Sequence, residues 1–286
     1  MSARVTQLDK QRFGPWALVT GASSGIGRAF AAHLAAGGIN LVLAARRLSI
    51  LEEVGRDLAR QHGIQVRSIR VDLAEPDFLN TLIDATDDLD LGLVVSNAGD
   101  MNLGEFVTTP REALLAELRV NTEAHLSLTR HFGQTLVRRG GGGILLVSSV
   151  AGIQGVPYIA NYSASKSYVL SLGEAVHREL SPRGVHVTVL VPGATATAMT
   201  ARFGADKTAM GRLMLSADAC AAEGLAALAA NRAVRISGRM NRATVALTPR
   251  RMRIRMFGVM NKSMADQVAA ASTPSTPGVG LGDRPV

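Results

Sequence analysis

A glycine-rich turn near the start of the chain constrains its fold more than any other stretch. Residues 20–27 read Thr-Gly-Ala-Ser-Ser-Gly-Ile-Gly, after the apolar run Trp16–Thr20 and before a helical stretch, Arg28–Ala36. A strand, a glycine turn and a helix in that order bring backbone N–H groups and a helix N-terminus to one place, and glycines leave no Cβ to block it. A pyrophosphate can bind there. The turn therefore predicts a dinucleotide-binding fold, although its glycines are not spaced as G-x-G-x-x-G.

Short apolar runs alternate with stretches of helical spacing along the rest of the chain. This alternation predicts an α/β fold: a doubly wound parallel sheet of the Rossmann type with helices on both faces. One long helix is expected over Arg111–Arg138 and another over Tyr162–Leu180. The predicted strands are Trp16–Thr20, Ile39–Ala44, Gln65–Val71, Leu91–Val95, Ile144–Val147 and Val185–Val191, with a last one at Arg232–Ser237.

Length and composition fit a single large domain. The chain has 286 residues, of which 47% are hydrophobic, enough to bury a sizeable core. We predict a domain at 13–248, preceded by a tail at 1–12 and followed by a basic amphipathic and then disordered extension at 249–286. Cys220 is the only cysteine, so no internal disulfide can form, and the six histidines show no metal-ligand spacing. No metal site is predicted.

The N-terminal residues and the lengths of the apolar runs indicate where the protein is located. Met1–Phe13 lacks the apolar core of a signal peptide, and no run of eighteen apolar residues occurs. We therefore expect a cytoplasmic protein that does not span a membrane.

The net charge is +8, but nine Lys or Arg and no acidic residue fall between Gly224 and Met264. Aromatic residues do not alternate with these basic ones, so a nucleic-acid surface is not expected.

Residues 250–264 combine arginines with Met252, Met256 and Met260 at intervals of four. Such a basic amphipathic segment can lie peripherally on an anionic membrane surface or dock on a partner. The alternative is a helix packed on its own subunit or on a dimer mate.

The end of the second predicted strand indicates the cofactor. In dinucleotide folds an acidic residue there binds the adenosine ribose, but this chain has Ala45, Arg46 and Arg47. An acid would repel a 2′-phosphate, whereas a guanidinium can bind it with two hydrogen bonds. NADP(H) is therefore favoured over NAD(H). The alternative is that both arginines simply face solvent.

Tyr162 and Lys166 lie four residues apart in a helical segment, so their side chains share a face. A unit charge about 4 Å from a phenol favours the phenolate by roughly 4 kcal/mol, which would bring a pKa near 10 close to neutral. A general acid/base works best there. Ser149 follows a strand, where its hydroxyl can hold a carbonyl oxygen. The alternative is that Tyr162 and Lys166 form an ordinary solvated pair with no catalytic role.

The combined motifs resemble those of the short-chain dehydrogenase/reductase family, in its one-domain form, over about Pro15–Gly238. The resemblance implies that Ser149 polarises the substrate oxygen and that Tyr162 exchanges its proton. It also implies that Lys166 lowers the tyrosine pKa and binds the nicotinamide ribose, and that Asn121 maintains a water relay. The matching segments are residues 20–27 (T-G-x-x-x-G-x-G), Asn97-Ala98-Gly99 (N-A-G), Asn121, Ser149, Tyr162, Lys166, and Pro192-Gly193 with Thr197 (P-G-x-x-x-T).

Two features depart from the family pattern. Ser96 replaces the first of two asparagines often found before Ala-Gly, and about fifty residues follow the last predicted strand. The catalytic residues predicted are Asn121, Ser149, Tyr162 and Lys166. The predicted cofactor contacts are Gly21, Ser23, Ser24, Gly25, Ile26, Gly27, Arg46, Arg47, Asp72, Leu73, Asn97, Ala98, Gly99, Tyr162, Lys166, Pro192, Gly193, Thr195 and Thr197.

Residues 194–215 follow the sixth predicted strand and would form a lid over the substrate. The segment carries flexible apolar side chains, which suggest a hydrophobic substrate such as an acyl, steroid-like or isoprenoid carbonyl. Ordinary packing within the lid is an equal alternative. These side chains are Met199, Phe203, Met210, Leu213 and Met214.

The sequence thus predicts an NADP(H)-dependent oxidoreductase that moves a hydride between nicotinamide and a carbonyl or secondary alcohol. The alternative from another class is a sensor or scaffold that binds NADP(H) without turnover, and a third is an epimerase or dehydratase of the same fold. The resemblance also implies a homodimer or homotetramer that pairs through Arg111–Arg138 and Tyr162–Leu180.

Overall fold

The computed structural model describes residues 8–203 and 214–272, with side chains as far as Val268. Two predicted lid residues, Met210 and Leu213, lie outside these ranges, as do residues 1–7 and 273–286. The predicted disordered tail is thus seen only at its start, where residues 269–272 continue a helix.

A seven-stranded sheet forms the centre of the molecule, with all its strand pairs parallel and the order β3-β2-β1-β4-β5-β6-β9. This confirms the predicted doubly wound α/β fold. The chain winds outward from β1 in one direction and from β4 in the other, so their carboxyl ends flank the crevice where such sheets bind ligands. The strands are β1 Trp16–Thr20, β2 Asn40–Ala45, β3 Val66–Arg70, β4 Leu91–Ser96, β5 Gly142–Val147, β6 Val185–Val191 and β9 Val234–Ile236.

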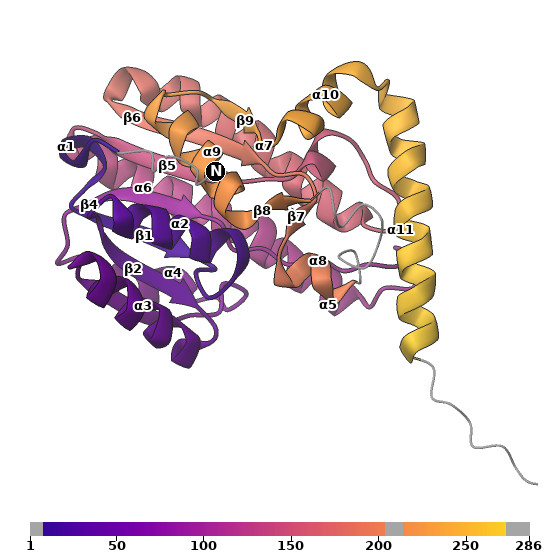
Figure 1. The fold of residues 1–286 in the computed structure, drawn as a ribbon, viewed down its shortest axis with the longest axis horizontal. Coiled ribbons are helices and arrows are strands. Elements are labelled where there is room, and N and C mark those ends of the chain that lie inside the picture. The colour runs from indigo at the N-terminus through magenta and orange to yellow at the C-terminus, as the bar shows by residue number, and fades with distance from the viewer. Residues whose placement is uncertain (1–7, 204–213, 273–286) are drawn as a thin grey trace, which may run out of the picture.

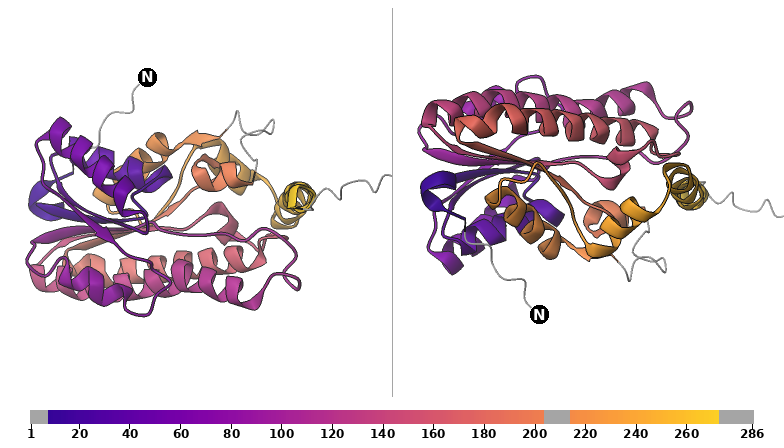
Figure 2. Two further views of the ribbon diagram at one scale, coloured as in Figure 1. Left: turned by 90° about the horizontal axis from the view of Figure 1, so that it is seen from below. Right: turned by 90° about the horizontal axis from the view of Figure 1, so that it is seen from above.

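Helices cover both faces of the sheet (Figures 1 and 2). Helices α2, α3 and α9 pack on one face, and α4, α6 and α7 on the other. The central strands are buried on both sides, which explains their continuous apolar runs. The helices are α1 Lys10–Phe13, α2 Gly25–Ala36, α3 Leu48–His62, α4 Phe78–Asp84, α5 Arg111–Leu118, α6 Ala124–Arg139, α7 Ala160–Leu180, α8 Ala198–Arg202, α9 Ala217–Ala229, α10 Arg239–Leu247 and α11 Arg250–Ser272. Two short strands, β7 Thr195–Ala196 and β8 Leu215–Ser216, pair separately.

The predicted helix over Arg111–Arg138 is interrupted. A π-helical turn at Arg119–Glu123 separates α5 from α6, and it contains Asn121, which is fully buried. The expectation of one regular helix is therefore wrong in this segment. Single π turns inside α-helices often occur at functional sites, because the extra residue redirects one side chain.

The C-terminal extension packs on its own subunit. Arg253 of α11 is buried and donates from Nε to Gln154 Oε1 (3.1 Å) and from Nη1 to the carbonyls of Thr248 (2.8 Å) and Val245. Asn261 Nδ2 donates to the Pro157 carbonyl (3.2 Å). In Figures 1 and 2, α11 lies at the edge of the molecule, beside the two helical layers. These contacts attach the extension to the segment that connects Ser149 with Tyr162.

Within the described ranges, the helices are all too short or too polar to cross a membrane.

Candidate active site

A cleft opens at the carboxyl ends of β1, β2, β4, β5 and β6, where the sheet topology predicts one. Almost all the predicted cofactor contacts line it: Gly21, Ser23, Ser24, Gly25, Ile26, Arg46, Arg47, Asp72, Leu73, Asn97, Ala98, Gly99, Tyr162, Lys166, Pro192, Gly193, Thr195 and Thr197. Gly27 does not line the cleft. Lining residues that the motifs had not indicated include Asp100, Val120, Ser148, Ala198 and Thr200.

The glycine turn has the backbone shape that its residues allow. Gly21 and Gly25 adopt positive φ angles of 68° and 56°. A Cβ on Gly27 would lie 2.3 Å from the Gly21 carbonyl oxygen, so this glycine lets α2 pack closely behind the turn. Asn97 ties the turn to the end of β4, because its Nδ2 donates to the carbonyl of Thr20 (2.9 Å). Helix α2 begins at Gly25 and directs its N-terminus, the positive end of its dipole, toward the cleft.

Both arginines after β2 are exposed and line the same cleft. Arg47 Nη2 donates to Ser23 Oγ (3.0 Å), which links the end of β2 to the glycine turn. In the part of the chain that the structure describes, neither Arg46 nor Arg47 forms an ion pair with an acidic side chain. Their charges are therefore available to an anionic ligand.

Ser149, Tyr162 and Lys166 meet on the β5 side of the cleft. Ser149 precedes a 3-10 turn, Val150–Ile153, and accepts from the Ala151 N–H (3.1 Å). Tyr162 lies in the first turn of α7, and its phenol hydrogen-bonds to Ser149. Lys166 is 3% exposed, and its Nζ donates to the Val147 carbonyl (3.1 Å). Hydroxyl, phenol and ammonium thus come from two segments that fold against each other.

Burial governs the protonation of this pair. It raises the pKa of Tyr162 to about 12, against the opposing effect of the Ser149 hydrogen bond, and lowers the pKa of Lys166 to about 8. The expectation that the ammonium brings the phenol close to neutral pH is wrong here. Lys166 Nζ is 5.8 Å from the centroid of the Tyr162 ring, and desolvation by burial is the largest effect on the phenol. The phenol therefore keeps its proton at neutral pH.

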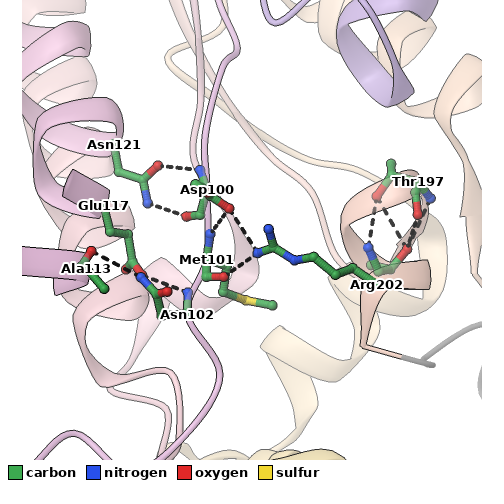
Figure 3. Close-up of polar contacts among 9 residues, drawn as sticks. Asp100, Met101, Asn102, Ala113, Glu117, Asn121, Thr197 and Arg202 are labelled. Carbon is green, nitrogen blue, oxygen red and sulfur yellow. Dashed lines mark hydrogen bonds and ion pairs between the residues drawn. The ribbon is translucent and has the colours of Figure 1, made fainter. Parts of the chain in front are cut away.

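Asn121 lies behind the cleft and not in its lining. Its Oδ1 accepts from the Asp100 N–H (2.9 Å), and its Nδ2 donates to the Asp100 carbonyl (2.8 Å) and to Ser165 Oγ (3.1 Å). Both amide protons are engaged, so the side chain holds the loop after β4 against α7. Figure 3 shows its two hydrogen bonds to Asp100.

Helix α8 closes one side of the cleft. Thr197 caps it, accepting from the Thr200 N–H (3.4 Å). From its end, Arg202 reaches across to the loop after β4 and donates to Asp100 Oδ1 (2.9 Å) and to the Met101 carbonyl (2.5 Å), as Figure 3 shows. Met199 lines the cleft, while Phe203 packs against the Arg202 guanidinium instead. The motifs gave no signal for the Arg202–Asp100 pair.

An apolar cluster surrounds the Tyr162 ring. It contains Met101 and Leu103 from the loop after β4 and Phe257 from α11, and its buried members are Ala151, Val156 and Ile159. Three separate parts of the chain thus build an apolar wall beside the phenol.

Comparisons with known proteins identify related dehydrogenases and reductases. The family model described as short chain dehydrogenase matches residues 15–208. A 7beta-hydroxysteroid dehydrogenase of Collinsella aerofaciens is 32% identical over 188 residues, covering 66% of this chain and 72% of its own. A very-long-chain 3-oxoacyl-CoA reductase of Phaeosphaeria nodorum is 34% identical over 198 residues, 66% of this chain and 58% of its own. A short-chain dehydrogenase from Sphingobium yanoikuyae, solved in complex with NADPH, superposes with a TM-score of 0.75 at 27% identity, covering 93% of this chain and 99% of its own.

Proposed function

The chain belongs to the short-chain dehydrogenase family, as its motifs predicted, and from this premise we propose an NADP(H)-dependent oxidoreductase that acts on a hydrophobic carbonyl or secondary alcohol. Family membership establishes oxidoreduction between CH–OH and C=O with a nicotinamide cofactor. The preference for NADP(H), the substrate class and the residue roles are the proposal. The observation that supports it most strongly is that Ser149, Tyr162 and Lys166 line the same cleft as the predicted cofactor contacts.

The residues of the cleft fit a dinucleotide. The turn brings Gly21 and Gly25, with positive φ angles, to the lining of the cleft, and the N-terminus of α2 would face a pyrophosphate there. Asn97 and Gly99 would border the nicotinamide ribose, together with Lys166. Asp72 would lie beside the adenine edge. When bound, the nicotinamide supplies or accepts the hydride.

The chain's own groups would handle the substrate oxygen and its proton. The Ser149 hydroxyl would hold the oxygen, and the Tyr162 phenol, kept neutral by burial, would donate a proton to it during reduction. Lys166 would place a positive charge beside the reacting centre, and Asn121 would fix the loop that borders it. Removal of water by the surrounding apolar wall would strengthen these interactions.

The Arg46→Ala variant tests the cofactor preference. We expect its KM for NADPH to rise by about tenfold while its KM for NADH changes less than twofold, because loss of a charge-assisted contact to a 2′-phosphate corresponds to about 1.5 kcal/mol. Steady-state kinetics with both cofactors would measure this. Arg60→Ala is the matched control, since Arg60 is an exposed arginine that does not line the cleft. Equal changes for the two cofactors would rule out a 2′-phosphate contact.

Two observations support a hydrophobic substrate. The wall beside Tyr162 is made of Met101, Leu103, Val156, Ile159 and Phe257. The relatives described above are named for a steroid and for very-long-chain acyl groups. A panel of steroid ketones, long-chain 3-oxoacyl thioesters and small polar ketones, followed by NADPH absorbance, would test the class. Binding of NADPH with no turnover of any ketone would favour the sensor or scaffold instead.

Attachment to a membrane surface is also part of the proposal, for a protein that its sequence predicts to be cytoplasmic. The outward face of α11 exposes Met252 (60%), Met256 (46%) and Val259 (68%), and Arg251 and Arg255 are exposed beside them. Apolar side chains flanked by cations suit an anionic bilayer surface. A homodimer or homotetramer through α6 and α7 is proposed as well, since these helices expose Leu126 and Tyr168.

Vesicle sedimentation tests the membrane contact. We expect the protein to pellet with vesicles containing 30% phosphatidylserine, because each basic residue near such a surface contributes about 1 kcal/mol, and to stay in the supernatant with neutral phosphatidylcholine vesicles. The double variant Met252→Glu with Met256→Glu should lose this binding, whereas Leu126→Glu, on another face, should keep it. Equal sedimentation with both kinds of vesicle would contradict the proposal.

A further inference from the structure

Glu117 is a buried carboxylate that the mechanism above does not use. It lies in the last turn of α5 and is 2% exposed, which makes it the one acidic side chain in the buried class among the described residues. No lysine or arginine of the described chain is within ion-pair distance of it. Isolated buried charge is unfavourable unless hydrogen bonds satisfy it. The contacts that retain this carboxylate therefore indicate what it does.

Three hydrogen bonds reach Glu117, all from amides. Its Oε2 accepts from the backbone N–H of Asn102 (2.8 Å) and from the Asn102 side chain (2.7 Å). Its Oε1 accepts from Asn161 Nδ2 (3.2 Å). Each asparagine also donates to a carbonyl of α5, Asn102 to Ala113 (3.2 Å) and Asn161 to Leu114 (3.0 Å). The carboxylate thus joins two segments to α5 at once.

Both segments border the reacting centre. Asn161 immediately precedes Tyr162 in α7. Asn102 lies between Met101 and Leu103, which pack in the apolar cluster of Tyr162. Figure 3 shows the same loop held at Asp100 by Asn121 from one side and by Arg202 from the other. Glu117 is the contact in this network that connects the loop directly to the start of the catalytic helix.

We propose that Glu117 is a positioning residue that fixes the substrate-side wall, the loop Asp100–Leu103, at a set distance from Tyr162. The inference rests on the proposed function, because it concerns the placement of substrate in the same site. A carboxylate suits this role since both of its oxygens accept, and all three groups that reach it donate. An amide in its place would turn one donor toward another donor.

The charge of Glu117 gives a second, electrostatic signature. The charged or titratable groups around it are Asp100, whose carboxylate pairs with Arg202, and Tyr162 and Lys166 of α7. The negative charge of Glu117 raises the pKa of Tyr162. Removing that charge should therefore lower the tyrosine pKa. Glu117 raises the pKa of Lys166 as well, so its removal should also lower that pKa. During reduction, activity falls when the phenol or the ammonium loses its proton, so the alkaline limb of the pH profile should move to lower pH.

The Glu117→Gln variant is the principal test, assayed in ketone reduction with NADPH. We expect the KM for the ketone to rise about tenfold or more, the Kd for NADPH to stay within twofold, and the alkaline limb of kcat to shift toward lower pH. Glu117→Asp keeps the charge and should keep the wild-type limb. Glu112→Gln removes an exposed carboxylate from the same helix and should match the wild type throughout.

Asn102→Ala provides a second route that leaves the carboxylate in place, in case Glu117→Gln does not fold. It removes the side-chain donor on the loop and should raise the ketone KM while leaving NADPH affinity and the pH limb unchanged. A ketone KM within twofold of the wild type in both variants, or an unmoved alkaline limb in folded Glu117→Gln, would overturn the role of Glu117. A wild-type protein that reduces no ketone would overturn the proposed function instead.

Discussion

Replacing Tyr162 with phenylalanine is expected to reduce turnover by about a thousandfold, the typical contribution of a positioned general acid. The substitution removes only the hydroxyl that hydrogen-bonds to Ser149. The ring remains, and it packs against the cluster of Ala151, Val156 and Ile159, so the apolar wall should keep its shape. NADPH affinity should stay within about twofold, since the residues proposed to contact the pyrophosphate and adenosine lie elsewhere in the cleft.

Steady-state reduction of a hydrophobic ketone and fluorescence titration with NADPH would measure these two quantities. Tyr168→Phe is the matched control, because Tyr168 lies on the same helix and is 40% exposed. Its turnover should equal that of the wild type. Retention of most activity by Tyr162→Phe would show that the phenol does not transfer the proton.

The Lys166→Met variant should lose at least about a hundredfold in turnover and yet gain stability at pH 7. Burial lowers the pKa of Lys166 from 10.5 to about 8 in the folded protein. The folded state therefore binds fewer protons than the unfolded state between pH 8 and 10.5, so the wild type should become more stable as pH rises through that window. Below pH 8 the shift corresponds to about 3 kcal/mol of destabilisation. The variant also loses the hydrogen bond to Val147, which would reduce its gain in stability by about 1 kcal/mol.

Urea unfolding at pH 7 and at pH 10 would measure the effect. We expect Lys166→Met to be about 2 kcal/mol more stable than the wild type at pH 7, with the difference shrinking at pH 10. The pKa of Tyr162 is raised to about 12, so the folded protein loses stability as the pH rises from 10 to about 12. This contribution is common to both proteins. Lys262→Met removes an exposed surface pair and should change stability little. A Lys166→Met protein that is less stable at pH 7 would show that burial does not disfavour the ammonium.

The central strands were predictable because they are buried on both faces and read as apolar runs. Val185–Val191 is apolar except at His186 and Thr188, and the structure keeps this strand with the same ends. The glycine turn was equally clear. Gly27 shows the limit of a motif, because it belongs to the pattern yet faces the Gly21 carbonyl and the Asn97 side chain and does not line the cleft. A glycine in a motif indicates that its position cannot accommodate a side chain. The motif does not show which neighbouring atoms fill the space.

Contacts between segments that lie far apart in the sequence could not be predicted. The π turn at Asn121 has the same apolar spacing as a regular helix, and it forms because the asparagine binds both backbone groups of Asp100. Glu117 and its partners are 15 and 44 positions apart, and Arg202 is 102 positions from Asp100. Likewise, the four-residue spacing of Tyr162 and Lys166 was visible, but the burial that sets their pKa values was not.

The C-terminal helix illustrates the same limit. Its methionines at intervals of four indicated one apolar face, but Met252 and Met256 face outward. The inward face contains Arg253, whose guanidinium reaches Gln154 and the carbonyls of Val245 and Thr248 at the end of α10. A buried arginine is tolerated when such acceptors surround it, and the sequence alone does not show them.

Isotope transfer tests the central claim most directly, that Ser149, Tyr162 and Lys166 form a carbonyl-reducing site beside a nicotinamide. NADPH deuterated at the transferring position of C4 would be incubated with the protein and a hydrophobic ketone, and the alcohol product analysed by mass spectrometry. We predict one deuterium on the carbinol carbon with the wild-type protein and no detectable labelled alcohol with Tyr162→Phe. An alcohol formed without deuterium, or equal labelling by the two proteins, would contradict the proposed chemistry.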